Sequence, residues 1–304
     1  MSHLGLALGG GGARGLAHIG VLKVLEREHI QLQAITGCSM GSIVGGLYAY
    51  YGNAKKVEEI IHDILHSPLI KKLGLEALSE EQETSSPKNY FEQFFDFISV
   101  RLQAVKALGR TSYFDEETTE KIFEIIPDVP IEELPVPFSA IATDLVSGNE
   151  INFDKGSLRQ AIRASSAIPG VFPPVEIDDY LLVDGSASES VPAGRVREIG
   201  ADRVLAVDVT RDIKIFKEPQ NILEVLLRTE DITSFHLSKI RLKEADLVIH
   251  PKVKEYSWVD FDRTDVIIAE GEIATLENIE EIKKLAHRNS YLLELEQYLK
   301  RLTS

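Results

Sequence analysis

The sequence has little of several residue types: its 304 residues include one cysteine, Cys38, one tryptophan and two methionines. A single cysteine excludes an intramolecular disulfide and any metal or redox motif built from paired cysteines, and it is typical of a reducing compartment. No stretch approaches the roughly 18 consecutive apolar residues of a membrane-spanning helix, and the N-terminus lacks the basic and apolar regions of a signal peptide. We therefore expect a cytoplasmic protein whose contact with a membrane, if any, is peripheral.

Basic residues are also in short supply, with 33 Lys and Arg against 48 Asp and Glu and a formal charge of −15. This balance disfavours nucleic acid as a partner and a polybasic membrane anchor, because both require clustered Lys and Arg. With 44 % hydrophobic residues, the chain is long enough for one large domain or two modest ones with a sizeable core. No cluster of His, Cys, Asp or Glu has the spacing of a metal site, so we expect neither a metal nor a cofactor.

Short apolar runs alternate with helical periodicity from residue 4 to about 210, a pattern that predicts an α/β fold with a mainly parallel central sheet. The predicted strands are 4–8, 32–36, 138–143, 150–153, 180–183, 203–209 and 245–249. The predicted helices are 14–28, 42–50 and 157–167, the last with Ser157 as its capping residue.

We expect residues 4–210 to form a catalytic domain and residues 211–304 to form a mostly helical extension packed on it. The polar stretch 79–89 precedes a helix with clustered aromatic side chains, and the two together make an insertion at 79–110. This helix is either a core helix or a lid that faces lipid; its aromatic residues are Phe91, Phe94, Phe95 and Phe97. The amphipathic helices between 265 and 302 either cover the core or form a homodimer interface.

A run of glycines follows the first predicted strand and leads directly into a helix. Glycines allow close backbone approach, so successive N–H groups can converge on an anion beside the positive end of the helix. The residues of this loop are Gly10, Gly11, Gly12, Arg14 and Gly15. The same letters fit the dinucleotide fingerprint, but that site needs an acidic residue about twenty positions on. Because none occurs between Glu28 and Glu58, an oxyanion-binding loop is favoured over a nucleotide site or a purely structural turn.

A second motif, Gly37-Cys38-Ser39-Met40-Gly41, lies between a predicted strand and a helix. In a nucleophile elbow the central serine occupies a strained turn, and the flanking glycines leave its side chain clear. Ser39 is therefore the candidate nucleophile, against the alternative of a plain turn with a capping serine. We expect Cys38 to be a small packing residue, and Gly45 and Gly46 to let the following helix pack close to the glycine loop.

A third motif, Asp184-Gly185-Ser186, ends an apolar strand. A serine hydroxyl is a weak nucleophile without a base, and a carboxylate at the carboxyl edge of the sheet lies where ligands bind in open α/β folds. Asp184 is therefore the candidate proton acceptor. The alternative is an Asp-Gly turn that holds a hairpin.

Four segments in this order, GGGGARGLAHIGVL, GCSMG, RASSAIPGVFPPV and VDGS, closely resemble the patatin-like phospholipase family, specifically its small bacterial members. The resemblance implies a lipid acyl hydrolase with a Ser–Asp dyad on a three-layer α/β/α sandwich. By motif, Ser39 matches the nucleophile and Asp184 the base, and the oxyanion-hole loop is matched by Gly10, Gly11, Gly12 and Arg14. The chain departs from the usual pattern at Ser186, where Gly or Ala is common, and at Ser190, where Asn is common.

The predicted function is hydrolysis of a lipid ester through an acyl-enzyme, as in a phospholipase A, a lysophospholipase or an esterase. One alternative is a Ser–His-dependent esterase or acyltransferase whose histidine is His236, His250 or His287. His18 is expected to be a packed or half-exposed helix residue. Another alternative is a catalytically silent lipid-binding protein.

Overall fold

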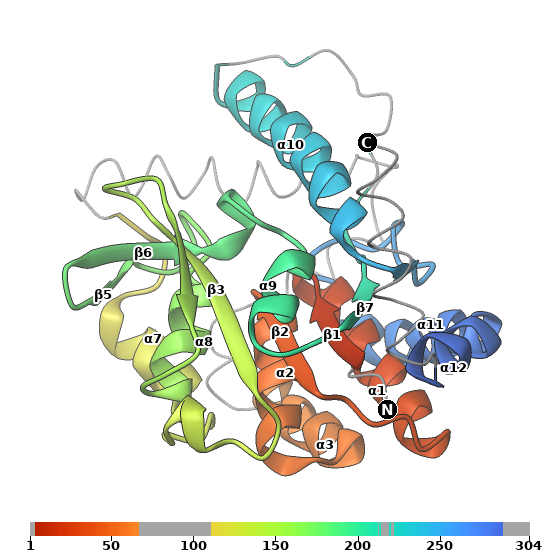
Figure 1. The fold of residues 1–304 in the computed structure, drawn as a ribbon. Coiled ribbons are helices and arrows are strands. Elements are labelled where there is room, and N and C mark those ends of the chain that lie inside the picture. The colour runs from red at the N-terminus through yellow and green to blue at the C-terminus, as the bar shows by residue number, and fades with distance from the viewer. Residues whose placement is uncertain (1–3, 67–110, 212, 214–218, 220–221, 288–304) are drawn as a thin grey trace, which may run out of the picture.

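The computed structural model describes residues 4–66, 111–211, 213, 219 and 222–287. The insertion predicted at 79–110, with its aromatic helix, lies outside these residues, as does the end of the C-terminal region. The described elements gather around one central sheet (Figure 1). The division of the chain near residue 210 stays a prediction.

An eight-stranded sheet forms the centre of the fold, in the order β5-β6-β3-β2-β1-β7-β8, with β4 paired to β3 off this path. The run from β3 through β2, β1 and β7 to β8 is parallel, whereas the pairs β3–β4, β3–β6 and β5–β6 are antiparallel. The predicted α/β class with a mainly parallel sheet is confirmed. The strands are β1 (Leu4–Leu8), β2 (Ala34–Cys38), β3 (Phe138–Asp144), β4 (Glu150–Phe153), β5 (Val175–Ile177), β6 (Tyr180–Asp184), β7 (Arg203–Val207) and β8 (Leu247–Ile249).

The bounds of β3 and β6 differ from the prediction by one residue, and β7 and β8 are each two residues shorter than predicted; the larger differences concern β2 and β5. The second strand was expected at 32–36, but β2 begins at Ala34 and continues through Gly37 to Cys38. The sequence pattern ends the strand at the glycine, yet Gly37 pairs in register with Leu8 of β1 and stays in the sheet. The three-residue strand β5 was missed because it is too short to show an alternating pattern.

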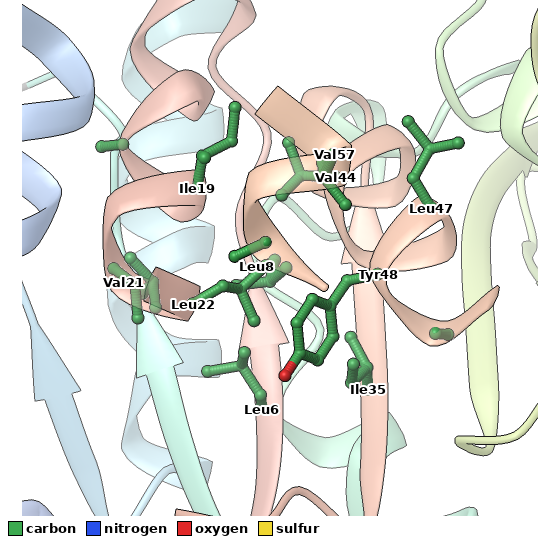
Figure 2. Close-up of a cluster of buried hydrophobic side chains, with 14 of the residues drawn as sticks. Leu6, Leu8, Ile19, Val21, Leu22, Ile35, Val44, Leu47, Tyr48 and Val57 are labelled. Carbon is green, nitrogen blue, oxygen red and sulfur yellow. The ribbon is translucent and has the colours of Figure 1, made fainter. Parts of the chain in front are cut away.

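Helices cover both faces of the sheet and complete the three predicted layers. On one face, Leu6 and Leu8 of β1 join a core built with side chains of α1, α2, α3, α11 and α12, part of which is drawn in Figure 2. On the other face, Ala7 packs with Ala193 and Val196 of α9. The helices are α1 (Ala17–Arg27), α2 (Met40–Tyr51), α3 (Ala54–Leu65), α7 (Glu116–Phe123), α8 (Leu158–Ser165), α9 (Ala193–Glu198), α10 (Ile222–Arg241), α11 (Thr264–Glu277) and α12 (Ile279–His287).

The first helix starts later than predicted, because a 3₁₀ turn over Gly12–Leu16 precedes α1. The cap predicted for α8 is present: the Ser157 Oγ accepts a hydrogen bond from the Gln160 N–H at 3.1 Å. The first of these features matters for the site, since the glycine loop ends in a tight turn rather than in a regular helix.

Helix α11 of the C-terminal region packs directly on α1 through two glycines. A Cβ added at Gly20 would lie 2.0 Å from the Ile268 carbonyl oxygen, and one added at Gly271 would lie 1.9 Å from the Ala17 carbonyl oxygen. Backbone atoms cannot yield as a flexible side chain can, so these glycines permit a helix contact that no larger residue allows. The glycine loop is thereby supported from the C-terminal part of the chain.

This contact predicts that Gly271→Ala destabilises the fold, although alanine is the better helix former by about 1 kcal/mol. Overpacking of a tight core contact costs about 1–3 kcal/mol, and the clash is with backbone. Urea unfolding measures the effect, with Ile273→Ala on the exposed side of the same helix as control, since exposed substitutions usually stay within about 0.5 kcal/mol. A Gly271→Ala protein as stable as the wild type would contradict the close packing of α11 on α1.

Candidate active site

The edge of β3 brings the ends of two strands together. β4 lies along one edge of β3 and pairs with both Ile141 and Ala142. On the other edge, Cys38 at the end of β2 is opposite Ile141, and Asp184 at the end of β6 is opposite Ala142. Because a strand has only two edges and β4 occupies one of them, β2 and β6 share the other, where their carboxyl ends meet. Ser39, which follows Cys38 directly, lies next to Asp184 because β6 runs antiparallel to β3 and β2 runs parallel to it.

Ser39 occupies a strained turn between β2 and α2. Its backbone angles are φ 51° and ψ −123°, in a region that residues with a side chain rarely adopt. The glycines on either side are required by close contacts. A Cβ at Gly37 would lie 2.3 Å from the Gly41 carbonyl oxygen, and a Cβ at Gly41 would lie 2.2 Å from the Leu8 carbonyl oxygen. The elbow geometry predicted for this motif is present.

Two neighbouring serines at the C-terminal end of α8 hold the backbone of Ser39 in this conformation. The Ser165 Oγ accepts a hydrogen bond from the Ser39 N–H at 3.1 Å, and the Ser166 hydroxyl donates to the Ser39 carbonyl oxygen at 3.3 Å. Both belong to the RASSAIPG segment, and neither was predicted to contact Ser39. Two adjacent small hydroxyl residues between a helix and a proline were the signal that could have identified them.

Asp184 is buried and surrounded by hydrogen-bond donors. Its Oδ1 accepts from the Ser186 N–H at 2.8 Å, and the Ser39 side chain is among the neighbours that lower the pKa of Asp184. Burial raises the pKa of Asp184 and outweighs these hydrogen bonds, which lower it. Gly185 leaves room for this arrangement, because a Cβ there would lie 2.3 Å from the Ile141 carbonyl oxygen. The carboxylate has little water to stabilise its charge and depends on its neighbours.

Cys38 is closer to the site than its predicted packing role implied. The thiol is fully buried, 3.8 Å from Asp184 Oδ1 and 3.4 Å from the Ser186 Oγ. Burial, with the nearby Asp184 charge, raises the pKa of the Cys38 thiol well above its ordinary value. The thiol therefore stays protonated and is a poor nucleophile.

The glycine loop reaches the site through Gly10. A Cβ at Gly10 would lie 2.6 Å from the Ser186 Oγ and 3.3 Å from the Ser39 Cβ. The Gly10 N–H itself donates to the Ser190 carbonyl oxygen at 2.9 Å. Gly10 therefore leaves space beside Ser39, while its own amide is occupied within the protein.

The other residues of the loop differ in whether they already have a hydrogen-bond partner within the protein. Arg14 donates from Nε to the Val209 carbonyl oxygen at 3.0 Å and from Nη1 to the Tyr256 carbonyl oxygen at 3.2 Å. Among the described residues, the Gly11 and Gly12 N–H groups have no hydrogen-bond acceptor. Of the four residues expected to form an oxyanion hole, two therefore hold the loop in place and two present open amides.

Besides the contact at Gly10, the loop meets the start of α2 at Gly15, and not at Gly45 and Gly46, which were expected to bring the two together. A Cβ at Gly15 would lie 2.6 Å from the Met40 side chain, so this glycine seats the loop against the first turn of α2. Gly45 and Gly46 instead face the strands and α8: their nearest neighbours are Ile35 and Ile162.

None of the histidines considered for a triad contacts Ser39. His250 lies at the end of β8, where its Nδ1 is 3.2 Å from Asp208 Oδ2. β8 is separated from β2 by β7 and β1, and three strand spacings of about 4.8 Å correspond to roughly 14 Å. His236 and His287 are exposed on α10 and α12.

Among the residues that the structure describes, no three His, Cys, Asp or Glu side chains gather in a way that could hold a metal ion. Within the same part of the chain, no helix is both long and apolar enough to cross a membrane.

The fold and the site together define an α/β protein whose serine stands on a strained elbow beside a buried carboxylate. The sequence model of the patatin-like phospholipase family matches residues 6–196. The chain belongs to this family, which confirms the resemblance drawn from its motifs.

Several relatives share this region. An uncharacterised NTE family protein of Mycobacterium tuberculosis is 35 % identical over 204 residues, 67 % of this chain and 48 % of that protein. Patatin-like phospholipase domain-containing protein 6 of Homo sapiens is 31 % identical over 68 % of this chain and 13 % of its own length. Lysophospholipase NTE1 of Cryptococcus neoformans is 30 % identical over 68 % of this chain and 11 % of its own length. The chain thus spans less than half the length of these relatives.

Solved structures show weaker likeness. VipD from Legionella pneumophila is 14 % identical, with a TM-score of 0.47 over 92 % of this chain and 67 % of VipD. The ExoU–SpcU complex of Pseudomonas aeruginosa is 14 % identical, with a TM-score of 0.43 over 94 % of this chain and 52 % of the matched chain. Both TM-scores are below 0.5, and the fold is defined by the sheet topology.

The raised pKa of Asp184 predicts that Asp184→Asn stabilises the fold at neutral pH. A carboxyl whose pKa is higher in the folded than in the unfolded state favours folding when protonated, and this advantage is lost as pH rises through the folded pKa. At pH 7 the wild type therefore carries an unfavourable buried charge that the amide lacks. Urea unfolding at a series of pH values measures the difference, which shrinks as pH falls from above the raised folded pKa toward the ordinary Asp value and is smallest below that value. A difference that grows toward low pH would contradict the assignment.

Proposed function

We propose that the chain is a serine hydrolase of lipid carboxylic esters that works with a Ser39–Asp184 dyad. The observation that carries the proposal is the meeting of β2 and β6 on one edge of β3, with Ser39 directly after the end of β2 and the buried Asp184 at the end of β6. Membership in the patatin-like phospholipase family supports a lipid as substrate. The name of the fungal relative, a lysophospholipase, points in the same direction.

The reaction has two halves. Asp184 accepts the Ser39 hydroxyl proton as the oxygen attacks the ester carbonyl carbon, and the tetrahedral intermediate collapses to an acyl-enzyme when the alcohol leaves with that proton. Water then gives a proton to Asp184 and attacks the acyl carbon. The fatty acid departs, and Ser39 recovers its proton from Asp184. No other group has to change its protonation state.

Burial makes Asp184 a stronger base than an ordinary aspartate. An ordinary Asp, with a pKa near 3.9, is a poor base for an alcohol. Burial raises the pKa of Asp184, and a substrate that excludes water from the site strengthens its hydrogen bond with Ser39 further. The Ser186 N–H at 2.8 Å keeps the carboxylate oriented while the proton moves.

Gly11 and Gly12 supply the oxyanion hole in this proposal. Their N–H groups are the open donors of the loop, and Gly10 brings the loop against Ser39. Preorganised backbone donors stabilise the charge that develops on the carbonyl oxygen without reorganisation during the reaction. Arg14 and the Gly10 N–H act indirectly, by holding the loop in position.

A Ser–His mechanism has less support, because His250 is occupied by Asp208 and lies three strands away from β2. Transfer of the acyl group to an acceptor other than water uses the same acyl-enzyme and differs only in the second half. A catalytically silent lipid-binding protein would not require a strained turn at Ser39, which costs of order 1–3 kcal/mol.

The proposal predicts that Ser39→Ala abolishes hydrolysis of lysophospholipid and of a nitrophenyl ester, and that Asp184→Asn lowers kcat by on the order of 10³–10⁴-fold. The amide keeps the shape of the carboxylate but cannot accept the proton. Release of fatty acid and of nitrophenol measures both activities. We therefore expect the Asp184→Asn substitution to stabilise the fold and to remove the enzymatic activity.

Asp178→Asn, in the exposed turn between β5 and β6, is the matched control and should retain full activity. His250→Ala should also retain it. Undiminished hydrolysis by a folded Asp184→Asn protein would overturn the dyad, and loss of activity in His250→Ala alone would favour the Ser–His mechanism.

A further inference from the structure

His18 is buried beneath the glycine loop, in the first turn of α1. Its side chain is fully buried, and its Nε2 lies 2.7 Å from the Gly9 carbonyl oxygen. A carbonyl oxygen can only accept, so the hydrogen bond requires the proton to be on Nε2. The packed alternative expected for this helix residue is confirmed, and the ring is in addition a specific donor to the loop.

The bond from His18 completes a clamp on one peptide group. The peptide that joins Gly9 to Gly10 has its carbonyl held by His18 and its N–H held by the Ser190 carbonyl oxygen at 2.9 Å. The two bonds act on opposite ends of the same rigid plane. Together they fix the orientation of the peptide that immediately precedes the open amides of Gly11 and Gly12.

The loop needs such a clamp because of its composition. Glycine populates positive and negative φ almost equally, so a peptide within a run of four glycines can rotate with little resistance from side chains. A rotated Gly9–Gly10 peptide would turn the Gly11 and Gly12 N–H groups out of the orientation that the proposed oxyanion hole requires. The glycines that let the loop approach Ser39 also leave the loop without side chains that would fix its conformation.

The ring is suited to this task in its neutral form. Burial lowers the pKa of His18 to about 4, so near neutral pH it carries one proton. With that proton on Nε2, Nδ1 is an acceptor and has no partner among the described residues. The single donor of the ring is therefore committed to the Gly9 carbonyl oxygen.

We propose that His18 is a positioning residue for the oxyanion hole, which it maintains by holding the Gly9–Gly10 peptide in place. This inference rests on the proposed function, because the loop matters only if its amides stabilise an oxyanion. His18 does not touch the substrate or the reacting atoms. Its contribution should therefore appear in kcat and not in KM.

The test compares His18→Gln with His18→Asn. The amide nitrogen of glutamine reaches about as far as imidazole Nε2, whereas that of asparagine stops near the position of Nδ1, so only glutamine can restore the bond to Gly9. We expect His18→Asn to lower kcat for a soluble nitrophenyl ester by on the order of 10–100-fold, less than the loss of an oxyanion donor itself, with KM changed less than about twofold. We expect His18→Gln to recover at least about half of that loss on a logarithmic scale.

Urea unfolding of both variants shows whether stability accounts for the difference. Equal kcat for the two variants at comparable stability would overturn the proposal, as would an effect on KM alone. Ser39→Ala in the same assay distinguishes failure of the proposed function from failure of the role of His18. If Ser39→Ala remains active, the proposed function is wrong. If Ser39→Ala is inactive while His18→Asn keeps full kcat, only the role of His18 is wrong.

Nitrogen NMR of the wild-type protein labelled in histidine tests the proposal without a substitution. The His18 ring should be neutral at pH 7, with its proton on Nε2. A proton on Nδ1 would leave nothing to donate to the Gly9 carbonyl oxygen and would overturn the proposal.

Discussion

The structure depends above all on the burial of one carboxylate, that of Asp184. A charge in this position is unfavourable unless neighbouring groups stabilise it, and here the neighbours are the Ser186 N–H, the Cys38 thiol and the Ser39 side chain. The carboxylate can occupy this place only because β6 runs antiparallel to β3 and ends where β2 ends. The same environment raises the pKa of Asp184 and makes it a stronger base. The cost to stability and the proposed activity therefore have one physical origin.

The glycines around this carboxylate serve a second constraint, which is the close approach of backbone to backbone. Gly41 lies against the end of β1, Gly185 lies against β3, and Gly10 lies against Ser39. A site built in this way is compact but has few side chains to hold it. Its rigidity comes from hydrogen bonds made by residues outside it, among them Arg14 and His18. These hydrogen bonds explain why a loop made of glycines can hold its N–H groups in fixed positions.

Much of the fold could be predicted from the sequence, because buried parallel strands leave continuous apolar runs and the helices between them keep their periodicity. The motif at Ser39 and the aspartate at 184 were found in the same way, from their positions after such strands. The head-to-head meeting of β2 and β6 could not be predicted, since pairing direction and register are set by contacts far apart in the chain. The roles of Ser165 and His18 were missed for a similar reason: each acts on backbone groups that sequence spacing does not bring together.

Labelling with a fluorophosphonate probe, followed by intact mass and peptide mapping, tests the central claim that Asp184 activates Ser39. The account predicts a single adduct on Ser39, formed much more slowly in Asp184→Asn than in the wild type and at the wild-type rate in the exposed control Asp178→Asn. No adduct in the folded protein, an adduct on another residue, or equal rates in the wild type and Asp184→Asn would contradict it.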